Sequence, residues 1–126
     1  MKRVLVIDDQ ESITRMLQAL IKSVGHDVRV AGNGKEGLAI CAEWNPDLIL
    51  TDIFMPDQDG LEIIRALRKT APHTRVIAMS GGGDIGDLDV LRTARVMGAA
   101  AVLTKPFQLD ELRACLQQVL GDEAGG

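Results

Sequence analysis

The sequence predicts a doubly wound α/β domain, in which helices cover both faces of a parallel five-stranded sheet. Three observations predict it. Short apolar runs recur with the length of buried strands, segments of helical periodicity lie between them, and the second run alternates apolar and polar residues as an edge strand does. Strands that alternate with helices require a parallel sheet, because parallel neighbours are joined by long right-handed crossovers.

The strands are expected where the apolar runs are bounded by polar or turn residues. Four of the runs are continuous, as in strands buried on both faces, whereas Val28 and Val30 alternate with polar neighbours. The expected strands are Val4 to Ile7, Asp27 to Ala31, Leu48 to Thr51, Val76 to Met79 and Ala100 to Leu103.

Five helices are expected between and after these strands. The first and last have the clearest apolar face, with hydrophobic residues three and four positions apart from Ile13 to Val24 and from Leu109 to Leu120. The other three are expected at Lys35 to Trp44, Gly60 to Lys69 and Asp87 to Val96, with turn signals between them.

An edge strand that comes second in the chain favours the strand order 2-1-3-4-5, the flavodoxin-like order. The domain is expected to span residues 1–120, and the glycine-rich residues 121–126 to form a flexible C-terminal tail.

The composition excludes several classes of protein. A net charge of −4 argues against direct binding of nucleic acid, which requires clustered Lys and Arg. No run approaches the length of a membrane span, and the N-terminus turns acidic too early for a signal peptide, so we expect a cytoplasmic protein. Cys41 and Cys115 lie in predicted helices without a metal-binding spacing, and are expected to be small buried apolar residues.

Polar residues follow the predicted strands at the edge where ligands of such sheets bind. Asp8 and Asp9 follow the first strand, Asp52 the third, Ser80 the fourth, and Lys105 lies close behind the fifth. Three carboxylates, a hydroxyl and an ammonium are therefore expected to converge.

This cluster predicts a cation site. Like charges about 4 Å apart repel by roughly 4 kcal/mol at an effective dielectric near 20, so three carboxylates need compensation. Lys105 supplies one positive charge, and oxygen ligands without nearby His or Cys favour Mg²⁺ for the rest. Mg²⁺ with Lys105 and Ser80 suits phosphoryl transfer to a carboxylate, although spacing alone leaves open which Asp attacks.

Four segments resemble the motifs of response regulator receiver domains of bacterial two-component systems. They are IDD after the first strand, TDIFMPDQDG after the third, MSG after the fourth and TKPF after the fifth. The resemblance covers nearly the whole chain and is to a chemotaxis-receiver-like domain.

The resemblance implies roles for single residues. Asp52 corresponds to the phosphorylated aspartate, Lys105 to the lysine that senses the phosphoryl group, and Ser80 to the hydroxyl drawn toward it. Asp8 and Asp9 correspond to the acidic pair that organises Mg²⁺, with Asp9 as a direct ligand and Asp8 acting through water. The backbone carbonyl of Phe54 corresponds to a further ligand beside Asp52, so the implied metal site is Asp8, Asp9, Asp52 and Phe54.

The resemblance also implies a function. A histidine kinase or phosphotransfer protein, docking near the first helix, would phosphorylate Asp52, and the loop and helix after Ser80 would change to alter partner binding or relay the phosphate. The output face would be the fourth helix, fifth strand and fifth helix, in a monomer or a weak phosphorylation-dependent dimer. The domain would catalyse only its own phosphotransfer and autodephosphorylation, and because no effector domain follows Leu120 it is expected to act on separate proteins.

Two features depart from the family pattern. Val102 stands three positions before Lys105, where receivers commonly carry an aromatic residue whose rotamer reports phosphorylation. The segment GGGDIGD after Ser80 is slightly longer than usual and is expected to be a flexible hinge rather than a nucleotide loop, because no Gly-Lys-Ser or Gly-Lys-Thr follows.

Other interpretations compete with the switch. Asp8 and Asp9 could simply cap the first helix. A phosphatase of the haloacid-dehalogenase type also forms an aspartyl phosphate, but requires Asp-x-Asp after the first strand, where this chain has Ile7-Asp8-Asp9-Gln10. A degenerate receiver used only for protein interaction is disfavoured because Asp8, Asp9, Asp52, Ser80 and Lys105 are all present.

Overall fold

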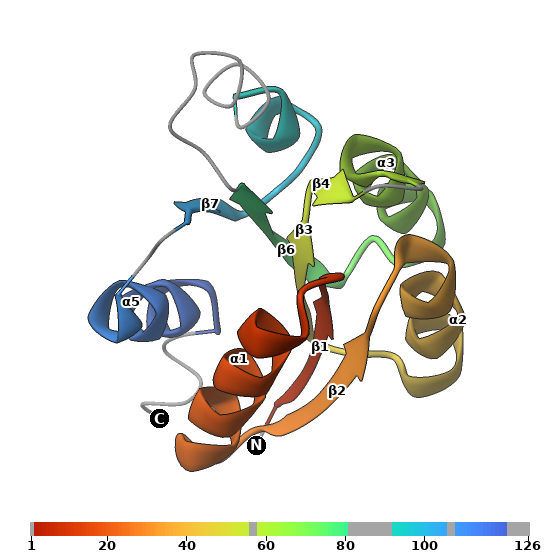
Figure 1. Ribbon diagram of the computed structural model, residues 1–126. Helices are drawn as coiled ribbons and strands as arrows, with labels where there is room; N and C mark the ends of the chain where they lie inside the picture. The colour runs from red at the N-terminus through yellow and green to blue at the C-terminus, as the bar shows by residue number, and fades with distance from the viewer. Residues whose placement is uncertain (1, 56–57, 81–91, 106–107, 121–126) are drawn as a thin grey trace.

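The central element is a parallel sheet of five strands in the order β2-β1-β3-β6-β7 (Figure 1). The computed structural model describes residues 2–55, 58–80, 92–105 and 108–120. Among the strands of this sheet the order is 2-1-3-4-5, so the predicted topology is confirmed. The strands are β1 (Arg3–Ile7), β2 (Asp27–Ala31), β3 (Leu48–Asp52), β6 (Arg75–Ser80) and β7 (Ala101–Thr104).

Helices cover both faces of this sheet, as predicted. Figure 1 shows α1 (Glu11–Ser23) and α5 (Leu109–Leu120) on one side, and α2 (Gly34–Trp44) and α3 (Gly60–Thr70) on the other. Residues 92–96 are also helical, and belong to the helix expected at Asp87 to Val96. The first part of that expected helix, up to residue 91, lies outside the described residues.

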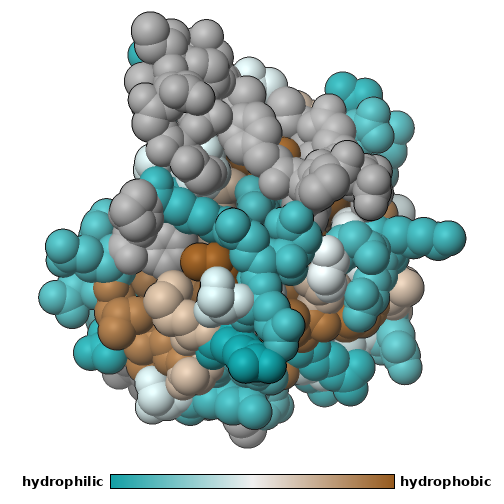
Figure 2. All heavy atoms as spheres, in the orientation of Figure 1, coloured by the Kyte–Doolittle hydropathy of each residue, from teal (hydrophilic) through white to brown (hydrophobic). Residues whose placement is uncertain are grey.

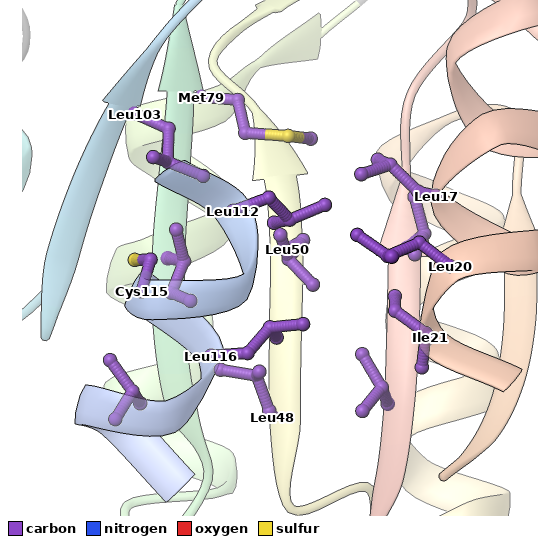
Figure 3. Packing of buried hydrophobic residues seen from close by; sticks show 14 of the residues in the cluster. Leu17, Leu20, Ile21, Leu48, Leu50, Met79, Leu103, Leu112, Cys115 and Leu116 are labelled. Carbon is purple, nitrogen blue, oxygen red and sulfur yellow. The ribbon is translucent and has the colours of Figure 1, made fainter. Parts of the chain in front are cut away.

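A cluster of aliphatic side chains joins α1 and α5 to one face of the sheet. Figure 3 shows Leu17 and Ile21 of α1 and Leu112 and Leu116 of α5 pointing toward Leu50 and its neighbours on β3. Each of these side chains is at most 3% exposed, and burying one stabilises the fold by about 1.5–3 kcal/mol relative to leaving it in water. The apolar periodicity of the two helices is thereby explained.

A second cluster packs α2 and α3 against the opposite face, around Leu5, Ile7 and Ile49. α2 approaches β1 closely at Gly37, where a Cβ atom would lie 2.7 Å from Cγ1 of Ile7. Cys41 belongs to this second cluster and Cys115 to the first, so the sheet separates the two thiols. Both cysteines are buried and unpaired, as expected, and burial raises the pKa of each thiol.

The strands extend slightly beyond the apolar runs that predicted them. β3, β6 and β7 include Asp52, Ser80 and Thr104 as their last residues. The ladder continues because it uses backbone groups, which a polar residue supplies as well as an apolar one. These polar side chains are consequently held by the sheet itself rather than by a loop.

A two-stranded hairpin of β4 (Phe54–Met55) and β5 (Gln58–Asp59) lies between β3 and α3, and the sequence did not predict it. Strands of two residues are too short to show an alternating pattern. Asp59 ends β5, immediately before α3 begins at Gly60.

The molecular surface is mainly polar on the side shown in Figure 2. Polar residues cover the outside of α1, whereas hydrophobic residues reach the surface on the side where α5 lies. Leu109, at the start of α5, is 48% exposed. Within the described ranges, no helix has the length and hydropathy needed to cross a membrane.

Candidate functional site

The carboxyl ends of four neighbouring strands carry the polar residues that the sequence singled out. Asp8 directly follows β1, Asp52 ends β3, Ser80 ends β6, and Lys105 directly follows β7. Register brings them together, because Asp52 pairs with Met79 and Ser80 with Thr104. The backbone N–H of Lys105 also donates to the carbonyl of Ser80 at 2.6 Å, which places Lys105 beside the end of β6.

The ammonium of Lys105 lies at the centre of the site. Nζ donates to Oδ2 of Asp8 at 2.7 Å, to Oδ2 of Asp52 at 3.1 Å and to Oε1 of Gln10 at 3.2 Å. Lys105 is only 9% exposed, and Asp8 and Asp52 are 1% and 4% exposed. The predicted convergence of these three residues is therefore observed, and water screens their charges only weakly.

Asp9 completes a cluster of three carboxylates. One oxygen from each of Asp8, Asp9 and Asp52 lies within 4.8 Å of the others. Asp9 is exposed, unlike its two neighbours. Three formal negative charges against one positive charge on Lys105 leave an excess of two, and oxygen ligands are what hard divalent cations prefer. The donor set therefore fits a divalent metal ion.

Ser80 contributes a buried hydroxyl that has no acceptor or donor within the described part of the chain. Its side chain is 0% exposed and its Oγ makes no hydrogen bond there. Buried hydroxyls are nearly always paired, and an unpaired one costs about 1–3 kcal/mol. An unpaired hydroxyl at the end of β6, next to Lys105, is available to a group that arrives at the site.

The acidic pair after β1 does not cap the first helix. Gln10 is the N-cap residue of α1, and no side chain caps the helix there. Oδ1 of Asp8 instead accepts a hydrogen bond from the backbone N–H of Gln10 at 2.9 Å, and its Oδ2 binds Lys105. Asp8 is thus turned into the site, as the functional interpretation requires.

Phe54 and Val102, two further positions of the family pattern, lie on strands of different sheets. Phe54 begins β4, two residues after Asp52, and its backbone pairs with Asp59. The metal-binding role of its carbonyl stays a prediction. Val102 is half-buried, pairs with Ala78 of β6 and packs against the second hydrophobic cluster. Val102 therefore lies three positions before Lys105, where receivers commonly carry an aromatic residue.

Among the described residues, Gln10 contacts Lys105 in the site although no sequence pattern pointed to it. A single polar residue after an acidic pair shows no periodic pattern. Its position just before the first helix is the one available signal, because Gln is not a favoured N-cap residue and its presence there calls for another explanation.

Comparisons with known proteins agree with this geometry. Residues 4–117 match the model of the response regulator receiver domain. The chain is 32% identical to sporulation initiation phosphotransferase F of Bacillus subtilis, over 94% of each chain. It is 38% identical to the uncharacterized transcriptional regulatory protein YkoG of the same organism, over 93% of this chain but 50% of that protein.

A solved structure agrees as closely. The receiver domain protein from Clostridium thermocellum superposes with a TM-score of 0.88 at 31% identity, covering 98% of this chain and 97% of that one. The shared fold and the match over nearly the whole chain lead to one conclusion. This chain belongs to the response regulator receiver domain family, the phosphorylation-dependent signalling switches of two-component systems.

Proposed function

We propose that Asp52 is the phosphoryl acceptor of this receiver domain, and that Lys105, Ser80 and a Mg²⁺ ion held at the acidic cluster assist the transfer. The observation that carries the proposal is the position of Lys105. Its buried ammonium binds both Asp52 and Asp8, from strands β3 and β1, at the edge of the sheet where ligands of this architecture bind.

The contacts favour Asp52 over its two acidic neighbours as the nucleophile. Both carboxylate oxygens of Asp8 already accept hydrogen bonds, one from Gln10 and one from Lys105. Asp9 is exposed, so a phosphoryl group on it would be open to water. Asp52 lies beside Lys105, on the strand next to the one that ends in Ser80.

The transfer is a displacement at phosphorus. A carboxylate oxygen of Asp52 forms a bond to the phosphorus of a phosphohistidine, the phosphorus–nitrogen bond breaks, and its electron pair stays on the imidazole, which takes up a proton. The product is an acyl phosphate on Asp52. Receivers of this family interact with histidine kinases or phosphotransfer proteins and with downstream effectors, which are the donors and readers that this reaction requires.

Charge neutralisation is the main contribution of the site. The proposed Mg²⁺ site consists of Asp9, Asp52 and the backbone carbonyl of Phe54 as direct ligands, with Asp8 acting through water. The ion, when bound, would neutralise charge on the phosphoryl oxygens. Lys105 would donate to one phosphoryl oxygen and the unpaired hydroxyl of Ser80 to another, which gives this buried hydroxyl the partner it lacks among the described residues.

Phosphorylation adds about one negative charge to Asp52 and thereby biases the loop and helix that follow Ser80. The proposed output face consists of that helix, β7 and α5, and each of the two helices carries one exposed hydrophobic residue. Val96, at the end of the helix, is 88% exposed, and Leu109 of α5 is 48% exposed. Apolar residues in such positions suit a protein partner, and docking of the kinase or phosphotransfer protein is proposed near α1.

The proposed domain, residues 1–120, includes every residue that matches the family model, and residues 121–126 are the proposed tail. Receivers are signalling switches rather than classical enzymes. For this chain we propose that its catalysis is limited to its own phosphorylation and autodephosphorylation, with the protein monomeric or weakly dimeric when phosphorylated.

The test is the intact mass of the protein after incubation with Mg²⁺ and acetyl phosphate. The native chain is expected to gain one phosphate, and Asp52→Asn none. Asp110→Asn, which changes an exposed aspartate on α5, is the matched control and is expected to gain one phosphate like the native chain. Addition that persists in Asp52→Asn would assign the acceptor to another residue.

The same experiment separates the competing interpretations. A phosphatase would turn over added phosphomonoesters many times per protein, whereas the switch holds at most one phosphate. A chain that folds and binds Mg²⁺ but gains no phosphate would be a receiver used for interaction alone.

A further inference from the structure

Gln10 occupies the N-cap position of α1 but its side chain does not cap the helix. N-caps are usually Ser, Thr, Asp or Asn, whose short side chains accept a hydrogen bond from the first turn. Gln10 makes no such bond, although its carbonyl accepts from the N–H groups of Ile13 and Thr14 at 3.1 Å each. Its backbone therefore starts the helix while its side chain points elsewhere.

The side chain of Gln10 reaches the candidate site. Oε1 accepts a hydrogen bond from Nζ of Lys105 at 3.2 Å, and the backbone N–H of the same residue donates to Oδ1 of Asp8 at 2.9 Å. An ammonium has donors only, so the amide oxygen rather than the amide nitrogen must face it. Gln10 is thus bound to both partners of the buried ion pair.

Within the described ranges, the ammonium of Lys105 has three acceptors, which match its three N–H bonds. Asp8 and Asp52 supply charged acceptors, and Gln10 supplies a neutral one. A neutral acceptor adds little to the charge balance of the site, but it fixes the direction of the third N–H bond. Gln10 therefore helps to hold the ammonium in the orientation that the two carboxylates favour and opposes its rotation.

We propose that Gln10 is a positioning residue, which orients the Lys105 ammonium for its interaction with the phosphoryl group. This inference rests on the proposed phosphorylation of Asp52. An ammonium that is already held beside Asp52 needs only to redirect one N–H bond, from Oδ2 of Asp52 to a phosphoryl oxygen, when negative charge develops there. Without Gln10 the third N–H bond turns to water, and the ammonium is held by two contacts instead of three.

The decisive variant is Gln10→Met, which keeps the length of the side chain and removes the amide oxygen. Because the native side chain does not cap α1, the start of the helix should be unaffected. The rate of phosphorylation by acetyl phosphate with Mg²⁺, followed by intact mass, is expected to fall about three- to tenfold, the order expected when a charged group loses one partly exposed hydrogen bond.

Two further variants serve as rescue and control. Gln10→Glu keeps an oxygen acceptor at the same reach and is expected to retain the native orientation of Lys105. Gln118→Met makes the same chemical change on the exposed side of α5 and is expected to leave the rate unchanged. In a Lys105→Met background, Gln10→Met should have no further effect, because its partner is gone.

A second measurement does not depend on phosphorylation. In NMR spectra of the unphosphorylated protein, the ammonium protons of Lys105, assigned by their loss in Lys105→Met, should exchange with water several-fold faster in Gln10→Met than in the native chain or Gln10→Glu. A native exchange rate and a native phosphorylation rate in Gln10→Met would overturn the inference and leave the proposed function intact. So would an equal slowing in the Lys105→Met background.

A chain that is not phosphorylated on Asp52 can be distinguished from one in which Gln10 has no positioning role. If the native chain gains no phosphate on Asp52, the role of Lys105 in phosphotransfer is lost. The exchange measurement would then show separately whether Gln10 holds the ammonium.

Discussion

A single ammonium organises the candidate site. Lys105 follows the last strand of the sheet and binds carboxylates 97 and 53 positions away in the sequence. Because these contacts are buried, removal of one partner would leave an unpaired buried charge at a cost of about 3–5 kcal/mol, whereas a surface ion pair is typically worth no more than about 1 kcal/mol. The position of one side chain thus decides which aspartate is beside a positive charge and which stays exposed.

Ser80 allows a prediction about stability that follows from its unpaired hydroxyl. In the native chain, Oγ of Ser80 has no hydrogen-bond partner among the described residues. Ser80→Ala therefore removes a buried hydroxyl that makes no stabilising hydrogen bond in the unphosphorylated protein. The free energy of unfolding, measured in urea without phosphodonor, is expected to stay level or to rise by up to about 1 kcal/mol.

Thr74→Val is the matched control for this prediction. Thr74 is also buried, but its Oγ1 donates to the carbonyl of Pro46 at 3.0 Å. Its replacement leaves that carbonyl without this donor and is expected to cost about 1 kcal/mol. Equal destabilisation by Ser80→Ala and Thr74→Val would mean that Ser80 has a structural partner in the unphosphorylated protein.

At the scale of secondary-structure elements, the packing of α2 against β1 helps to position Asp8, the residue that follows β1. Gly37 lets the helix approach Ile7, which is fully buried and directly precedes Asp8. A side chain at position 37 would have to displace Ile7, because the surrounding cluster leaves it no open space.

Gly37→Ala is therefore expected to lower the free energy of unfolding by about 1–2 kcal/mol. The overlap with Ile7 outweighs the higher helix propensity of Ala, which alone would stabilise by up to about 1 kcal/mol. In Gly37→Ala, the further change Ile7→Val removes the crowded Cδ1 and should recover part of the loss, measured as a coupling energy in urea unfolding.

Gly32→Ala provides the comparison. Its added Cβ would meet only Oε2 of Glu36, at 4.0 Å, so its effect is expected to lie within about 0.5 kcal/mol. Additive effects of Gly37→Ala and Ile7→Val would show that the two side chains do not compete for space.

At the scale of the whole molecule, the acidic cluster links ion binding to global stability. Three carboxylates and one ammonium meet at one edge of the sheet, with two more negative than positive formal charges. Their mutual repulsion opposes folding when no divalent ion is bound. An ion that binds only the folded state stabilises it, by about 2.7 kcal/mol at a concentration one hundred times its Kd.

Asp9→Asn is expected to change stability in opposite directions with and without Mg²⁺. In EDTA the variant should melt slightly above the native chain, since one of the three like charges is removed, an effect of about 1 kcal/mol for charges about 4 Å apart near water. In Mg²⁺ it should melt below the native chain, because it has lost a proposed ligand. Thermal unfolding in the two buffers measures both effects.

Asp110→Asn should gain as much stability from Mg²⁺ as the native chain does, since Asp110 lies in the first turn of α5 rather than in the acidic cluster. An undiminished gain from Mg²⁺ in Asp9→Asn would remove Asp9 from the proposed metal site.

Most of the fold, and the position of most of the candidate site, could be predicted from the amino-acid sequence. Apolar periodicity and run length, which depend only on neighbouring residues, predicted the strands of the main sheet and their order, and the helices from α1 to α5 as far as the structure describes them. Parallel strands end at a common edge, so the residues that follow them, Asp8, Asp52, Ser80 and Lys105, are predicted to lie together from strand order alone.

The side-chain contacts at that edge of the sheet could be seen only in the folded structure. Whether Asp8 caps a helix or binds Lys105, that Gln10 supplies the third acceptor, and that β4 and β5 form a hairpin all depend on the relative positions of segments far apart in the chain. Side-chain hydrogen bonds need placement within a few tenths of an ångström, which packing of the whole core provides and local sequence patterns do not encode.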